Sequence, residues 1–447
     1  MNILRAIRIL GFLSAVIFLA ECSSKDLGDT DGSGGGDDAS VDIDGSIASK
    51  KYTWVKNTLD PKAAGLHATI DAQGNHLGVA YFRVAPSEVV VSCPASGVSP
   101  AGDKPRPTYE LFYVDYNGSE WGSPVKVDET YGIVMGASLA IHSTSGQRTV
   151  GYLGGTVSAV ECSVSDAMLA TSADGVSWNK QTLATSGPVG DTVGYWMSVA
   201  LDSAGAPHAV YGDFRFGYYY ENDDRQKASV RYDQGEAIAE NNGAGHFTSL
   251  KFNTSDEPVV AFFNPMQKDS EGGIQVGVKS GGVWKLQQLV SGGTEAYPQL
   301  NTDGKGVFGL AYFEPGGKNL RYVESKAGLA DWKDVVVDKT TTHNGEYSSL
   351  AYDSQGNPGI SYYRCGPAGA TQCDLTKDGL MFSYRQNGVW KVHEVDKGGE
   401  FRCGVYSSLT FTANDQPVIA YQCVMFDNTN SENPYVDTLK VTRGVLE

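Results

Sequence analysis

Six ring-bearing side chains recur at one position of a repeating pattern in this chain. They stand three residues before the first apolar anchor of a repeat and are His67, Trp196, Phe247, Tyr297, Tyr347 and Tyr406. Flat apolar ring faces are groups on which sugar rings can stack. The alternative is that the rings are wedged between adjacent repeats as ordinary packing. Both interpretations place the six residues around the mouth of one central channel.

Four arginines are candidates for binding an anionic group. Arg83, Arg215 and Arg364 stand near the ends of apolar runs, and Arg402 precedes Cys403. A guanidinium binds a carboxylate through two parallel hydrogen bonds, and glycosyl transfer needs a positioned nucleophile. If at least three of the four arginines meet beside Tyr and Glu, a glycosidase or lyase is indicated. If the arginines pair with neighbouring loops instead, a glycosidase or lyase is excluded.

These residues belong to a unit that occurs seven times. Its copies span 66–82, 137–153, 197–213, 248–264, 298–314, 348–364 and 407–423. In each copy a short apolar run meets a turn, and an alternating run ending in an aromatic residue follows. Aspartate can accept hydrogen bonds from NH groups two residues on, and glycine supplies positive φ. Three turns contain both an aspartate and a glycine at these places: Asp71 with Gly74, Asp202 with Gly205 and Asp353 with Gly356.

A second hairpin follows each unit, as in 320–338, where Trp332 opens the outer strand. Four antiparallel strands repeated about every 50–70 residues are typical of a β-propeller. The 54 Gly, 24 Tyr and 7 Trp, with only 19% charged residues, suit many short strands joined by tight turns. We predict an all-β fold, a seven-bladed β-propeller of four-stranded antiparallel blades, over residues 51–447. An open stack of hairpins and two separate sandwiches are the alternatives.

The two ends of this region each contain half of a hairpin. The segment "LKVTRGVLE" (439–447) stops one residue short of the tryptophan that similar segments reach, and "KYTWVKNTLD" (51–60) holds Trp54 with no partner strand before it. We therefore predict that the N-terminal strand completes the last blade. This pairing would cover sheet edges that are otherwise exposed.

The N-terminal residues indicate export. Residues 1–21 combine a basic start with a short apolar run, which is typical of a signal peptide. Residues 19–22 resemble a bacterial lipoprotein box, which implies that Cys22 carries lipid such as palmitate; cleavage by the ordinary signal peptidase is the alternative. Residues 22–50 are mostly Gly, Ser and Asp and are predicted to be a flexible acidic tether.

Lipidation of Cys22 leaves six of the seven cysteines for disulfide bonds in an oxidising compartment. In a propeller, all six map to the face where loops enter the innermost strand and leave the second strand; we call this face the top end. Two local bonds are predicted from proximity in the sequence, and the third follows by elimination. The pairs are Cys365–Cys373, Cys403–Cys423 and Cys93–Cys162.

Other classes of function find no support in the sequence. The net charge of −17 and the pI near 4.8 argue against a nucleic-acid partner. The chain has no zinc-protease motif, nucleophile elbow or phosphate loop. The run "GKGVFG" (304–309) lies in a predicted hairpin turn without a following helix, so it has no helix N-terminus to bind pyrophosphate. We expect no cofactor, no metal and no catalytic residue.

Two resemblances add to this interpretation. The turn "SADGVSW" (172–178) resembles, with one residue fewer, the Asp-box turns of the sialidase-like superfamily, and this likeness is architectural. Over residues 19–447 the chain resembles repeat-propeller lipoproteins of Gram-negative bacteria, with repeats after a lipidated cysteine and an acidic spacer. That resemblance implies a propeller anchored by lipid to the outer membrane, facing either the periplasm or the cell surface.

The first hypothesis is a monomeric, lipid-anchored envelope propeller that is a non-enzymatic binding or scaffold module. Its partner would be an envelope protein or a surface polysaccharide bound at the top end, with the six ring residues and four arginines as contacts. The alternatives are a sialidase-like propeller glycosidase or lyase, and a structural subunit of an outer-membrane complex.

Overall fold

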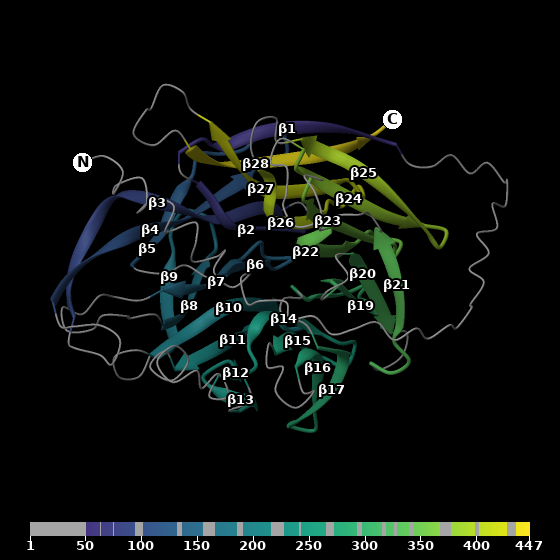
Figure 1. Ribbon diagram of the computed structural model, residues 1–447, viewed down its shortest axis with the longest axis horizontal. Helices are drawn as coiled ribbons and strands as arrows, with labels where there is room; N and C mark the ends of the chain where they lie inside the picture. Colours follow the sequence, from purple (N-terminus) through teal and green to yellow (C-terminus); the bar gives the residue numbers. More distant parts are fainter. Residues whose placement is uncertain are drawn as a thin grey trace, which may run out of the picture. The chain divides into compact units, whose positions relative to one another are not determined.

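The computed structural model describes residues 51–447 apart from short internal segments. The gaps are 63, 75, 94–101, 132–135, 155–165, 186–190, 216–227, 241–242, 265–271, 293–296, 315–318, 326–328, 339–343, 367–376, 398–401 and 427–434. The signal peptide, Cys22 and the tether predicted for residues 1–50 lie outside the described residues. The described chain forms seven four-stranded antiparallel sheets (Figure 1), which confirms the predicted all-β, seven-bladed fold.

The sheets are the blades, numbered here one to seven by their innermost strands. Blade one contains β2 (Ala64–Gln73), β3 (His76–Cys93), β4 (Gly102–Tyr116) and β5 (Val125–Tyr131). Blade two contains β6 (Ala137–Ile141), β7 (Arg148–Gly154), β8 (Asp166–Ser172) and β9 (Asn179–Ala184). Blade three contains β10 (Asp191–Leu201), β11 (Pro207–Arg215), β12 (Ser229–Tyr232) and β13 (Glu236–Ala239).

The remaining blades follow the same order from the innermost strand outward. Blade four contains β14 (His246–Phe252), β15 (Pro258–Asn264), β16 (Gly273–Ser280) and β17 (Val283–Ser291). Blade five contains β18 (Gln299–Thr302), β19 (Phe308–Phe313), β20 (Leu320–Ser325) and β21 (Lys333–Asp338). Blade six contains β22 (Asn344–Tyr352), β23 (Pro358–Arg364), β24 (Gly379–Gln386) and β25 (Val389–Lys397). Blade seven contains β26 (Cys403–Phe411), β27 (Pro417–Phe426), β28 (Tyr435–Leu446) and β1 (Tyr52–Asp60).

The innermost strands form a closed ring. Each contacts the innermost strand of the next blade, from β2 through β6, β10, β14, β18, β22 and β26, and β26 contacts β2. The hydrophobic core is divided in the same way, with one cluster between each pair of neighbouring blades. No blade covers its own apolar faces, so each depends on both neighbours for burial. The alternatives of an open stack and two sandwiches do not apply.

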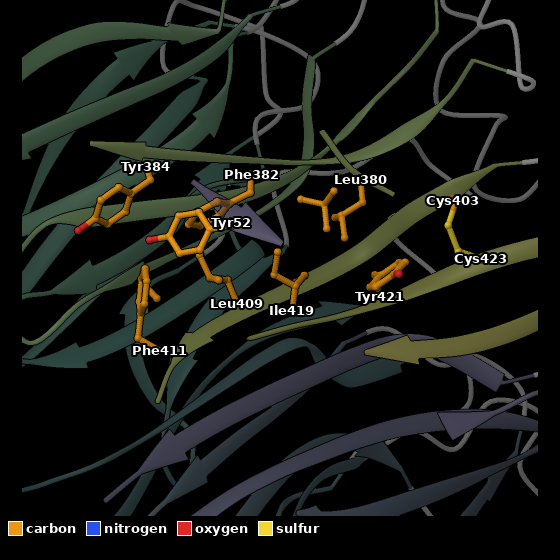
Figure 2. Packing of buried hydrophobic residues seen from close by; sticks show 12 residues of the cluster. Tyr52, Leu380, Phe382, Tyr384, Cys403, Leu409, Phe411, Ile419, Tyr421 and Cys423 are labelled. Atoms are coloured by element: carbon orange, nitrogen blue, oxygen red, sulfur yellow. A yellow bond between two sulfur atoms is a disulfide. The ribbon is translucent and has the colours of Figure 1, made fainter. Parts of the chain in front are cut away.

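The chain's first described strand completes its last blade. β1 pairs antiparallel with β28, and the register sets Trp54 opposite Gly444 and Tyr52 opposite Leu446. Figure 1 shows the two strands side by side. Tyr52 packs edge-on against Phe382 of blade six at 5.8 Å between ring centroids, and Figure 2 shows it within the cluster between blades six and seven. The hairpin left unfinished at the C-terminus is therefore completed from the other end of the described chain.

The second strand of a blade shows why the repeats are so apolar. Every described residue of β7, β15 and β19 is buried, whereas β17 and β25 at the outer edge are largely exposed. A strand in the middle of a blade has both faces covered by neighbouring blades, so both of its side-chain sets must be apolar. This explains why each repeat ends in a nearly continuous run of apolar residues.

The turns between first and second strands have the predicted chemistry in two blades. Asp202 accepts hydrogen bonds from the NH groups of Ala204 and Ala206, and Gly205 has φ of 81°. Asp353 and Gly356 repeat the arrangement in blade six. In blade one Gly74 has the predicted positive φ, 59°, but the prediction is wrong for Asp71. Its strand continues to Gln73, and its carboxylate instead accepts hydrogen bonds from the NH groups of Ala72 and of Ile141 in blade two.

Hydroxyl side chains join the innermost strands into the ring. A serine or threonine of one blade accepts a hydrogen bond from a backbone NH of the next blade at 3.0–3.2 Å, and this occurs at six of the seven junctions. The acceptors are Thr69, Ser138, Ser198, Ser249, Ser349 and Ser408. At the seventh junction the Asn301 amide donates to the carbonyl of Leu350 at 2.6 Å. The ring thus satisfies backbone groups at its inner edge that have no ladder partner.

Candidate functional site

One backbone position at the top end is left-handed in all seven blades. It holds the six predicted ring residues, with φ of 49° at His67, 45° at Trp196, 53° at Phe247, 45° at Tyr297, 51° at Tyr347 and 50° at Tyr406. Blade two has Gly136 there, with φ of 84°. A residue with a side chain pays about 1–2 kcal/mol for this conformation. Because the conformation recurs in every blade, it is part of the architecture of the ring.

A glycine two residues earlier explains how the strand reaches this conformation. The glycines are Gly65, Gly194, Gly245, Gly345 and Gly404, with φ between 97° and 116°. A side chain at Gly404 would place its Cβ 2.8 Å from the Cα of Leu380, in the third strand of the preceding blade. The start of β26 therefore runs directly against that blade. The ladder then shifts register between Val405 and Ser408, which leaves Tyr406 out of regular pairing.

The six rings contact one another from blade to blade. Neighbouring ring centroids are 4.3 Å apart for His67–Tyr406, 4.8 Å for Tyr406–Tyr347, 5.2 Å for Tyr347–Tyr297, 4.4 Å for Tyr297–Phe247 and 4.9 Å for Phe247–Trp196. We call these six residues the aromatic belt. The belt has no ring in blade two, where a Cβ on Gly136 would approach the Cα of Trp196 to 3.0 Å.

Every side chain of the aromatic belt is half-buried. Each ring therefore packs on its neighbours and keeps some surface accessible to solvent. The two sequence interpretations, contact between blades and a surface for stacking, are both compatible with this geometry. The structure brings all six residues together, as the sequence predicts, while their ligand-binding role stays a prediction.

The four candidate arginines do not gather at one point. Arg83 donates through Nε and Nη2 to Asp60, and Arg364 donates to Asp338 at 3.2 Å. Both carboxylates are buried and belong to the outermost strand of the preceding blade, so these arginines join neighbouring blades. The side chain of Arg215 lies outside the described residues.

With two of the four committed to blade junctions, the condition of at least three converging arginines is not met. The predicted arrangement of a sialidase-like carboxylate site is therefore wrong for Arg83 and Arg364. The physical reason is that each guanidinium balances a buried aspartate, which would otherwise be an unpaired charge.

Arg402 has different surroundings. Its guanidinium is half-buried at the top end of blade seven, within electrostatic range of Tyr347, Tyr363, Tyr406 and Asp437. Tyr347 and Tyr406 belong to the aromatic belt. Burial raises the pKa of Asp437 to about 6, although Arg402 and a hydrogen bond to Gln422 act in the opposite direction. The guanidinium of Arg402 and the carboxyl of Asp437 thus lie near the aromatic belt.

A buried acid lies next to this group. Asp378 is fully buried and accepts hydrogen bonds from the Tyr363 hydroxyl and, at 2.8 Å, from the NH of Gly366. Burial raises the pKa of its carboxyl above the usual range. Tyr363 in turn lies 6.5 Å from the Tyr347 ring, so Asp378 fixes a residue that supports the aromatic belt.

The disulfide bonds at the top end agree with the sequence where they are described. Cys403 and Cys423 are bonded and face each other across β26 and β27, which confirms that predicted pair. Cys365 is also disulfide-bonded, and its predicted partner Cys373 lies outside the described residues. Cys162 and the side chain of Cys93 lie outside them as well.

Asp396, Cys403 and Cys423 form the one cluster of metal-type ligands in the described part of the chain. Both sulfurs are committed to the disulfide, so neither is a thiolate that could bind a metal. Asp396 accepts from the Tyr421 hydroxyl at 2.8 Å and pairs with Lys56 at 2.5 Å. The cluster therefore joins blades six and seven.

The chain is similar to several proteins of known structure. No family model and no curated protein matches the chain. Among solved structures it is similar to the NanB sialidase of Streptococcus pneumoniae (11% identity, TM-score 0.44, 87% of this chain and 69% of that one) and to the phage phi92 endosialidase (10%, 0.47, 88% and 68%). It is also similar to an alpha-L-arabinanase of Penicillium chrysogenum (11%, 0.43, 88% and 98%). All three likenesses have TM-scores under 0.5, and the seven-bladed β-propeller fold is given by the sheet topology of the chain itself.

Sequence reasoning missed several residues of this region. The Gly-x-aromatic pattern, as in "GVY" starting at Gly404, recurs in five blades and is a sequence signal for the left-handed backbone position. Tyr363, Asp378 and Asp437 carry no such signal, because they lie in different elements and meet only in the folded ring. Their roles depend on long-range packing.

Proposed function

We propose that this protein is a lipid-anchored, non-enzymatic binding module of the cell envelope whose aromatic belt binds a surface polysaccharide. The observation that supports the proposal is the run of six half-buried rings, 4.3–5.2 Å apart, around the top end. Sugar rings present apolar C–H faces, and such faces stack on aromatic side chains. A belt of rings on one rim offers several adjacent positions for the sugars of one oligosaccharide.

Two features favour a preformed surface. The six ring residues hold left-handed backbone conformations, which persist only where the surrounding structure imposes them. The disulfide Cys403–Cys423 fixes the strand that carries Tyr406. Side chains held in place before binding lose little conformational entropy when a ligand arrives. The belt is thus suited to binding by stacking.

Lipidation of Cys22 would place the propeller at the outer membrane, with residues 22–50 as a tether that lets the top end reach a partner. We propose a monomer, because each blade has its neighbours within the chain. An envelope protein as partner is the other outcome to be tested. Crosslinking in intact cells, with a tagged protein and Cys22→Ala as control, distinguishes a protein partner from a polysaccharide.

The binding proposal is tested with the full chain, purified in mild detergent, on an array of oligosaccharides. We expect binding, and an affinity about tenfold weaker for the double variant Tyr347→Ala/Tyr406→Ala, which removes two adjacent stacking surfaces. Trp332→Ala is the matched control, because Trp332 is a half-buried aromatic residue immediately before the outer strand β21. If neither variant alters binding, or if no oligosaccharide binds, the proposal is wrong.

A further inference from the structure

Arg402 is exceptional among the arginines of this protein. Eight arginine side chains are described, and seven donate a hydrogen bond to another residue: Arg83, Arg148, Arg231, Arg321, Arg364, Arg385 and Arg443. Within the described part of the chain, the Arg402 guanidinium makes no hydrogen bond and no ion pair. Leaving a half-buried charge without a partner costs free energy. Among these eight, the Arg402 guanidinium is therefore the one whose donors are not used by another described residue.

The position of this guanidinium is well defined. The carbonyl of Arg402 accepts a hydrogen bond from the NH of Val424 at 2.8 Å, and the next residue forms the disulfide Cys403–Cys423. The residue is thus held at its backbone, while its side chain has no hydrogen-bond partner among the described residues. Tyr347 and Tyr406, whose ring centroids are 4.8 Å apart, are its electrostatic neighbours in the aromatic belt.

We propose that Arg402 binds the carboxylate of an acidic saccharide while a sugar ring of the same ligand stacks on Tyr347 and Tyr406. This inference rests on the proposed function and names the class of saccharide. A guanidinium presents two parallel N–H donors that match the two oxygens of a carboxylate. Tyr363, which donates to the buried Asp378, lies 6.5 Å from the Tyr347 ring and is a further electrostatic neighbour of Arg402.

The carboxylates already present do not satisfy Arg402. Asp437 lies within electrostatic range of the guanidinium without a hydrogen bond to it, and Asp378 is engaged by Tyr363 and Gly366. A ligand carboxylate would therefore give the guanidinium a hydrogen-bonded partner that the described residues do not supply. Neutral saccharides would use the aromatic belt alone.

The test compares three matched groups of oligosaccharides, neutral, carboxylated and sulfated, on the full chain and its variants. We expect carboxylated members to bind about tenfold or more tightly than neutral ones. Arg402→Gln should remove this preference and leave binding of neutral members unchanged. Arg402→Lys keeps the charge but not the two-donor fork, so it should restore only part of the preference. Arg321→Gln, which alters net charge equally on the outer part of blade five, should have no effect.

Each outcome bears on one of the two proposals. Equal affinity for neutral and carboxylated members, or a preference that survives Arg402→Gln, would overturn the role of Arg402 and leave saccharide binding standing. A stronger preference for the sulfated group would overturn the carboxylate assignment. Absence of binding to every group would overturn the proposed function itself. Methyl esters of the bound carboxylated oligosaccharides give a second measurement, and they should bind only as tightly as neutral ones.

Discussion

At the scale of single residues, Arg83 and Arg364 join neighbouring blades, whereas Arg402 has no hydrogen-bond partner among the described residues. The tyrosine of the second strand donates to an aspartate of the preceding blade in four places: Tyr81 to Asp60, Tyr152 to Asp128, Tyr362 to Asp338 and Tyr421 to Asp396. Arg83 and Arg364 complete two of these groups. At these four positions the repeated tyrosine joins neighbouring blades, whereas Tyr211 and Tyr312 donate to residues of their own blades.

This difference predicts effects of different size on stability for the two arginines. Arg83→Gln removes the partner of Asp60, whose side chain is 3% exposed, and should lower the free energy of unfolding by about 1–3 kcal/mol. Arg402→Gln removes no hydrogen bond to a described residue and should lower that free energy less than Arg83→Gln does. Urea unfolding of the two variants makes the comparison. A loss at Arg402 as large as that at Arg83 would contradict the account of an unpaired guanidinium.

A histidine on blade three predicts a pH dependence of stability. His208 Nδ1 lies 2.7 Å from Asp233 and 2.8 Å from the Tyr232 hydroxyl, and Nε2 lies 3.5 Å from Asp202. The hydrogen bond to Asp233 raises the pKa of His208. The folded protein therefore binds more protons than the unfolded chain, where histidine has a pKa of about 6.5. This contribution is complete below that value and is lost as pH rises through the higher folded pKa.

Thermal unfolding measured between pH 5 and pH 9 checks this prediction, with His208→Gln as the control. The difference in stability between the native protein and the variant should shrink as the solution becomes alkaline. A difference that grows with pH would show that the sign is wrong.

At the scale of elements, the start of each innermost strand depends on close approach to the preceding blade. Gly404 has φ of 106°, and its Cβ would lie 2.8 Å from the Cα of Leu380. Gly306 has nearly the same φ, 108°, but nothing within 4 Å. An alanine at either position would therefore have similar backbone strain. Only an alanine at Gly404 would also press against the neighbouring blade.

Gly306→Ala should therefore cost about 1–2 kcal/mol from backbone strain alone. Gly404→Ala should cost clearly more, because β26 must also move away from blade six. It should further weaken oligosaccharide binding, since Tyr406 is two residues along the same strand. Chemical denaturation and affinity measurements on both variants are the check. Equal stability losses would mean that the approach to Leu380 is not a determinant of the strand's position.

The elements that the sequence predicts well are those set by local patterns. Apolar runs, Asp-x-x-Gly turns and the position of the ring residues are all local, and the structure contains them. Asp71 was misassigned because its turn depends on how far β2 extends. The left-handed backbone at Tyr406 depends on packing against blade six. The surroundings of Arg402 come from residues on four separate strands, which no local spacing encodes. They are Tyr347, Tyr363, Tyr406 and Asp437.

At the scale of the whole molecule, the closed ring of innermost strands creates the candidate site. No blade contains more than one residue of the aromatic belt, and the belt exists only because β26 meets β2 and brings Tyr406 to His67 at 4.3 Å. The pairing of β1 with β28 completes blade seven, which carries Tyr406 and Arg402. Fold closure and the proposed ligand binding are therefore linked in this protein.

The most direct test of the account uses Trp196, the one tryptophan of the aromatic belt. The full chain is titrated with the tightest-binding oligosaccharide from the array while tryptophan fluorescence is recorded. The account predicts a saturable change that is present in the native protein and in Trp332→Phe and is lost in Trp196→Phe. A change that persists in Trp196→Phe and disappears in Trp332→Phe would place the ligand away from the belt and contradict the central claim.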